Sequence, residues 1–180
     1  MADPGSGPVT RFIDRMNLAL RVVAGLLMIV ATIAISYQIV IRFVLTAFEI
    51  RVSAPWTEEI ARYCFIWSTF LGAATLCRTN GLISVDFLAI LLPPKCSRLL
   101  QVLVVLVCTG FFLVLTWVGW EWTAMSFHEV SPVLRLPMAY VYGAMPVGGA
   151  IAALNFVMLL VEQLQQARPE SHQLDTIAAE

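Results

Sequence analysis

Long apolar runs alternate with short polar segments along this chain, and the only charge within them is Arg62, near the start of the second run. Each run approaches or exceeds about 20 residues, the length that a helix needs to cross the hydrocarbon core of a bilayer. The pattern therefore predicts an all-α membrane protein with four transmembrane helices. The predicted spans are Val22–Ile41, Ala61–Cys77, Leu99–Trp120 and Leu136–Val161.

Two of these runs carry further detail. The second run is short and can extend back to Trp56. The fourth run contains Pro137, which we expect in the first helical turn, where a missing N–H costs little. It also contains Pro146, which we expect to kink the helix from within.

A shorter apolar segment, Leu82–Leu92, lies between the second and third runs and has Asp86 in its middle. An aspartate at the centre of a bilayer costs roughly 3 kcal/mol on insertion scales. We therefore expect a short interfacial helix here. A fifth span is the alternative, and it would need Arg78 and Lys95 on opposite sides of the membrane.

The composition agrees with a membrane protein, since 59% of the 180 residues are hydrophobic and only 13% are charged, against about 25% charged in soluble domains. No basic block predicts binding to nucleic acid. We expect a disordered cytoplasmic lead-in over 1–15, a single membrane domain over 16–165 and a cytoplasmic tail over 166–180.

The distribution of lysine and arginine predicts the orientation, because these residues are enriched in cytoplasmic flanks. Seven fall on the side of the N-terminus and four on the other, which favours both termini in the cytoplasm. The first group is Arg11, Arg15, Arg21, Arg78, Lys95, Arg98 and Arg168; the second is Arg42, Arg51, Arg62 and Arg135.

A polar cluster opens the second predicted span. Pro55 suits a first helical position, and Glu58 and Glu59 follow where the helix dipole favours anions. Arg62 lies four and three residues after them, on a shared helix face. The residues alone favour a charged helix start at the membrane surface, with Trp56 as an anchor; a docking patch for a partner is the alternative.

Groups able to carry catalysis or bind a metal are sparse. The histidines His128 and His172 stand far apart, and none of the four cysteines forms a C-x-x-C motif. We therefore expect no catalytic site, no metal, no cofactor and no disulfide framework. Asp86 is expected to be interfacial, and the tryptophans near the end of the third span, Trp117, Trp120 and Trp122, an aromatic belt.

Small residues cluster at two places, and they allow helices to approach closely, either within the chain or against a partner. The residues alone leave these alternatives open. The two clusters are Gly72-Ala73-Ala74 and Gly143 with Gly148-Gly149.

The chain resembles the small membrane subunit of the tripartite ATP-independent periplasmic (TRAP) transporters over about residues 11–165. The resemblance rests on short motifs in the expected order. They are Trp56-Thr57-Glu58-Glu59 with Arg62, Trp67, Leu71-Gly72-Ala73-Ala74, Ile83-Ser84-Val85-Asp86 after Arg78, Leu136-Pro137-Met138, Tyr142 and Met145-Pro146-Val147-Gly148. Leu82 departs from the family, which often has histidine there, so no role of that histidine is carried over.

The resemblance implies an inner-membrane importer of organic acids, such as C4-dicarboxylates or sialic acids, driven by a sodium gradient. A periplasmic solute-binding protein delivers the solute and a large multi-span permease carries it, while the small subunit is a fixed support in the lipid bilayer. The residues expected to meet the permease are Trp56, Glu58, Glu59, Arg62, Trp67, Gly72, Pro146 and Gly148. Arg78 and Asp86 are expected at the membrane–water interface instead.

Two other function classes remain as alternatives. A four-helix membrane disulfide oxidoreductase would need paired cysteines at the outer face or near a quinone. A small exporter working as a homo-oligomer would need a carboxylate within its spans.

Overall fold

The structure, a computed structural model, describes residues 8–45, 55–78 and 94–177. Helix α1 (Pro8–Val40) continues as a π-helical turn over Ile41–Leu45. The remaining long helices are α2 (Pro55–Arg78), α4 (Pro94–Met125) and α6 (Ala144–Ile177), with a 3-10 turn at Ser126–His128 and the short helix α5 (Ala139–Tyr142) between the last two.

Four helical stretches are long and apolar enough to cross a membrane, which confirms the predicted fold class. They are Thr10–Phe43, Pro55–Arg78, Leu99–His128 and Ala139–Glu162. Helix α1 already includes residues 8–15, and α6 runs into the expected tail. The expected interfacial helix Leu82–Leu92, with Asp86, lies outside the described residues.

The fourth span begins later than predicted. Pro137 forms an isolated antiparallel bridge with Val130 instead of a first helical turn, so its predicted place was wrong. The N–H of Met138 bonds to the carbonyl of Glu129 at 2.9 Å, which holds this stretch in hairpin-like pairing until the helix starts. A turn at Gly143 then separates α5 from α6.

Pro146 accounts for that interruption. Proline has no N–H to offer the carbonyl four residues earlier, and its ring crowds the same carbonyl. In this chain that carbonyl belongs to Tyr142, the last residue of α5. The predicted irregularity is therefore present and lies one residue past the end of α5.

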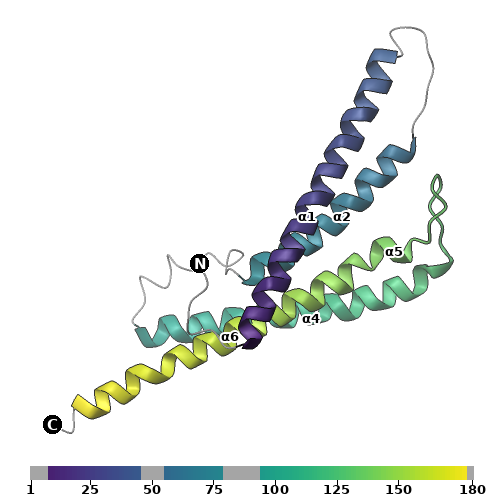
Figure 1. The fold of residues 1–180 in the computed structure, drawn as a ribbon. Coiled ribbons are helices and arrows are strands. Elements are labelled where there is room, and N and C mark those ends of the chain that lie inside the picture. Colours follow the sequence, from purple (N-terminus) through teal and green to yellow (C-terminus); the bar gives the residue numbers. More distant parts are fainter. Residues whose placement is uncertain (1–7, 46–54, 79–93, 178–180) are drawn as a thin grey trace.

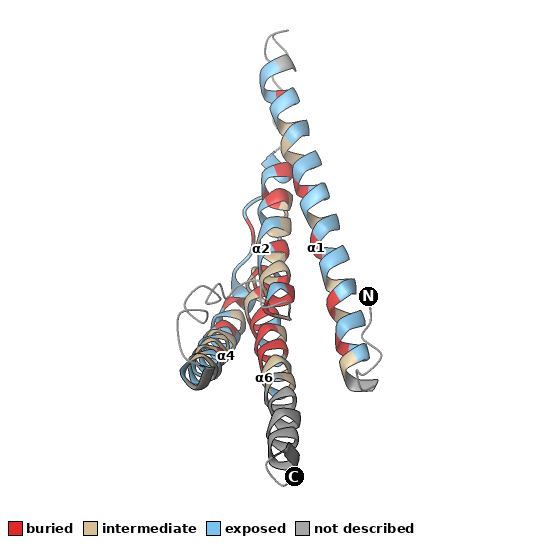
Figure 2. Ribbon diagram, turned by 90° about the vertical axis from the view of Figure 1, so that its left-hand side faces the viewer, coloured by how far each residue is buried: buried red, intermediate tan, exposed pale blue. Residues whose placement is uncertain are grey.

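The helices pack in the order α1, α2, α6, α4 (Figure 1). Only 11% of the most apolar window is buried in each outer helix, α1 and α4, compared with 33% in α2 and 44% in α6. Figure 2 shows the same contrast, with pale blue covering most of α1. The two central helices therefore hold the structure together, and the outer two face mainly away from the protein.

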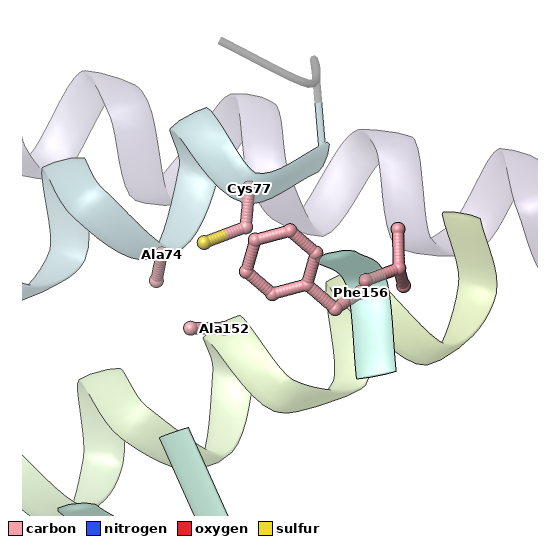
Figure 3. Packing of buried hydrophobic residues seen from close by; sticks show 5 residues of the cluster. Ala74, Cys77, Ala152 and Phe156 are labelled. Carbon is pink, nitrogen blue, oxygen red and sulfur yellow. The ribbon is translucent and has the colours of Figure 1, made fainter. Parts of the chain in front are cut away.

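A small apolar cluster lies where α2, α4 and α6 meet. It contains Ala74 and Cys77 from α2, Val105 from α4, and Ala152 and Phe156 from α6. In Figure 3 the Phe156 ring lies beside Cys77, and the two alanines face each other across the α2–α6 contact. The small alanines let the helix backbones approach and make room for the one large ring.

Two adjacent glycines bring α6 against both of its neighbours. A Cβ on Gly148 would lie 2.7 Å from the Cβ of Phe70 in α2, and one on Gly149 would lie 2.7 Å from the Thr116 hydroxyl oxygen in α4. Both contacts are closer than a Cβ allows. This small-residue patch is therefore used within the chain.

We predict opposite effects for two glycine-to-alanine changes. Gly110→Ala adds a methyl group where nothing lies within 4 Å, and helix propensity favours alanine by up to about 1 kcal/mol. Gly148→Ala must push α2 from α6 and should destabilise the protein by roughly 1–3 kcal/mol. Denaturation in mixed detergent micelles measures both; a loss of stability in Gly110→Ala equal to that in Gly148→Ala would contradict the packing.

Candidate functional site

Charged and polar side chains gather at the two ends of α2. The first group surrounds Glu59, which is only 7% exposed although it is ionisable. Its carboxylate accepts hydrogen bonds from the hydroxyl of Ser131 and from the backbone N–H groups of Val133, at 3.1 Å, and Leu134, at 2.9 Å. Glu59 therefore binds the connection between α4 and α5.

That connection is tightly turned. The N–H of Ser131 bonds to the carbonyl of Leu136 at 2.9 Å, and the N–H of Arg135 bonds back to the carbonyl of Ser131 at 3.2 Å. Arg135 has a φ of 52°, in the left-handed region, where residues other than glycine are uncommon. The Glu59 carboxylate thus provides the acceptor for two backbone donors of this turn.

Glu58 and Arg62 point away from this turn. Their side chains pair at 3.1 Å and are 60% and 63% exposed. Such a surface pair contributes only about 0.2–1 kcal/mol to stability. The structure therefore divides the predicted polar cluster: Glu59 bonds within the chain, and the Glu58–Arg62 pair lies on the surface.

Several other residues that the sequence analysis assigned to the permease contact make contacts within this chain instead. The indole N–H of Trp67 donates to the carbonyl of Tyr140 at 3.0 Å, and the rings of Trp56 and Tyr37 lie 6.1 Å apart. Pro146 packs against Gly119 of α4, where a Cβ would lie 3.0 Å from the proline ring.

One face of α2 is left uncovered by the described helices. Six of its residues recur at alternating intervals of four and three, which places them in a line along the helix. All have exposed side chains except Gly72, which is half-buried, and a Cβ at Gly72 would meet nothing within 4 Å. This line, the α2 seam, consists of Glu58, Arg62, Phe65, Thr69, Gly72 and Leu76.

The second polar group lies at the opposite end of α2. The guanidinium of Arg78 donates two hydrogen bonds of 2.7 Å to the carboxylate of Glu162 in α6 and one of 2.9 Å to Asp14 in α1. The Arg78 side chain is only 11% exposed. A single arginine therefore joins three helices, and its fork geometry suits the two parallel bonds to Glu162.

A buried pair of asparagine side chains lies close to Arg78, and the sequence analysis did not identify it. Each of Asn17 and Asn155 donates to the other, at 2.8 and 2.7 Å, and Asn155 also donates to the carbonyl of Ala74 at 2.8 Å. Asn155 is fully buried. Its position alone in an uncharged run could have marked it, because a buried amide needs partners.

The cysteines behave as free thiols. Cys64, Cys77, Cys96 and Cys108 form no disulfide in the described structure, and the thiol of Cys77 donates to the carbonyl of Ala73 on its own helix at 3.1 Å. Over the same described ranges, no group of three histidine, cysteine or acidic side chains could hold a metal ion.

This arrangement defines a class: a small multi-pass helical membrane protein whose helices are joined at both ends, with one helix face left open. The family comparison makes the class specific. The model of the DctQ component of tripartite ATP-independent periplasmic transporters matches residues 31–166, and the chain belongs to this family of small transporter permease subunits.

Three similar proteins are also permease proteins of TRAP transporters. A TRAP transporter small permease protein of Haemophilus influenzae is 26% identical over 152 residues, covering 83% of this chain and 89% of the relative. The C4-dicarboxylate small permease protein DctQ of Pseudomonas aeruginosa is 28% identical, covering 61% and 55%. The isethionate permease protein DctMQ of Oleidesulfovibrio alaskensis is 27% identical, covering 79% of this chain but 23% of that relative.

We predict that two adjacent glutamates differ strongly in their effect on the α4–α5 connection. Glu59→Ala leaves the buried Ser131 hydroxyl and two part-buried backbone N–H groups without their acceptor, and the buried hydroxyl alone costs about 1–3 kcal/mol. Glu58→Ala should cost under about 1 kcal/mol. Limited proteolysis at the connection, with thermal unfolding in detergent, measures both; equal protection in the two variants would contradict the role of Glu59.

At the other end of α2, we predict that Arg78→Ala destabilises the chain by roughly 1.5–3 kcal/mol, because two partly exposed carboxylates lose their charged hydrogen-bond donor. The reversal Arg78→Glu with Glu162→Arg should recover part of that stability, because the pair is rebuilt with opposite signs. Unfolding of both variants tests this. No recovery in the reversal relative to Arg78→Glu alone would count against a direct pair.

Proposed function

We propose that this chain is the fixed membrane support of a sodium-driven transporter that imports an organic acid delivered by a periplasmic solute-binding protein. The large permease subunit carries the solute, and this chain packs beside it in the inner membrane. Both termini then lie in the cytoplasm, with Arg78 at the cytoplasmic side and Glu59 at the periplasmic side. Membership of the DctQ family supports this proposal.

The α2 seam supports this proposal most directly. Its outer part presents a charged pair, and its middle presents Gly72, beside which a second helix has room to approach. Small residues are a feature of helix contacts in membranes, because they let two helix backbones approach closely. We assign the large permease to this seam because the seam is the open face of α2. The relative named DctMQ, of which the matched segment is 23%, supports a large permease as the partner.

A fixed role agrees with how α2 is held. Glu59 ties one end of α2 to the α4–α5 connection, and Arg78 ties the other end to α1 and α6. A helix bonded at both ends keeps its outer face in one position. A partner that moves during transport needs such a face to move against.

The partner residues inferred from the sequence then fall into two roles. Glu58, Arg62 and Gly72 are proposed to touch the permease directly, with Trp56 at the edge of the contact. The other four act by holding the seam in place. They are Glu59, Trp67, Pro146 and Gly148.

Two glycines give a matched test of the seam. Gly72 in α2 and Gly110 in α4 both have open space where a side chain would stand. We predict that Gly72→Leu blocks close approach of the permease and lowers its recovery with the tagged small subunit at least fivefold. Gly110→Leu should leave recovery unchanged. Equal recovery in both variants, each inserted at normal levels, would remove the seam from the interface.

Uptake measurements test the proposed sodium-driven import directly. Proteoliposomes containing this chain, the permease and the solute-binding protein should take up a C4-dicarboxylate or a sialic acid only with a sodium gradient. Glu58→Ala with Arg62→Ala should lower uptake without changing the sodium concentration at half-maximal rate. Uptake that persists without sodium would exclude the proposed driving force.

A further inference from the structure

The depth of Arg21 in the bilayer follows from the positions of the two membrane surfaces relative to α2. Glu59 and Arg78 are 19 residues apart on α2, or about 28 Å, close to the roughly 30 Å hydrocarbon thickness of a bilayer. The exposed Glu58–Arg62 pair must also lie at a polar boundary. Together these groups place the two membrane surfaces near the two ends of α2.

Two contacts then fix the depth of Arg21. Asp14 bonds to Arg78, and Arg21 follows seven residues later in the same helix, about 10 Å farther into the membrane. The hydroxyl of Ser68, about 15 Å from Arg78 along α2, bonds to the carbonyl of Ala24. Arg21 lies about one turn back from Ala24, which again gives about 10 Å.

Arg21 is exposed at this depth. The ion pairs within the described ranges join Arg62 to Glu58 and Arg78 to Asp14 and Glu162, and none includes Arg21. A charge in the hydrocarbon layer needs an anion or a path to the surface. Side chains of a helix tilt toward its N-terminus, which here is the Arg78 end, so the guanidinium can extend to the nearer surface.

The helix surface above Arg21 has the shape for an acyl chain. Gly25 follows one turn later on the same side of α1, and Met28 follows it. A Cβ at Gly25 would meet nothing within 4 Å, and Met28 is exposed. A cation below an open apolar strip matches a molecule with an anionic head and a hydrocarbon tail.

We propose that Arg21 and Gly25 form a phospholipid site on α1, with the lipid phosphate on the guanidinium and one acyl chain over Gly25. The site serves the leaflet at the Arg78 end. It does not depend on the proposed transport function, because it needs only a bilayer. It lies on α1, apart from the α2 seam.

Native mass spectrometry of the full chain in detergent with added phosphatidylglycerol tests the site. Arg21→Leu should weaken retention of one lipid about tenfold. Arg15→Leu is the matched control, because Arg15 is also exposed on α1 but lies next to Asp14 at the surface. It should change retention less than twofold.

Further arms separate the head from the tail. Gly25→Leu keeps the charge but fills the strip, and it should also weaken retention, which keeps the test valid if Arg21→Leu fails to fold. Diacylglycerol, which lacks phosphate, should not be retained, and millimolar inorganic phosphate should not displace the lipid. Equal retention by Arg21→Leu and Arg15→Leu, or displacement by phosphate alone, would overturn the proposal.

Discussion

The structure depends on how α2 ends at each membrane surface. The hydrocarbon core of a bilayer has no hydrogen-bonding groups, so polar groups near these ends must find partners in the protein or at the membrane boundary. Glu59 takes donors from the α4–α5 connection, and Arg78 takes acceptors from α1 and α6. Because these partners lie on other segments, satisfying the ends of one helix also fixes the arrangement of all four.

Between these ends, the helices are held by close packing and by one buried amide pair, not by ion pairs. Lipid tails are as apolar as leucine, so apolar contact alone gives transmembrane helices little reason to associate. Gly148 and Gly149 let α6 touch both neighbours, and the reciprocal bonds of Asn17 and Asn155 join α1 to α6. Helix α1, which has few other contacts beyond α2, gains from this pair a fixed place at the Arg78 end.

The open face of α2 follows from the same arrangement. Helix α1 covers one side of α2 and α6 covers another, and the helices pack in a row that leaves α2 a third side. A row of helices has more free surface than a closed four-helix bundle. A small subunit built this way can present an extended, rigid face to a larger protein, and this open face is where we propose that the large permease binds.

The sequence by itself determined the four spans, the irregularity at Pro146 and the shared helix face of Glu58, Glu59 and Arg62, because each depends on length, periodicity or spacing within one helix. It gave no means to choose between Glu58 and Glu59 for the buried role, nor to see that Arg78 meets Asp14 and Glu162. The prediction put Pro137 in a helical turn because it used only the residues that follow it in sequence. The structure pairs Pro137 with Val130, seven residues earlier, which those residues do not reveal. Those outcomes depend on which helix covers which face, and only tertiary packing decides that.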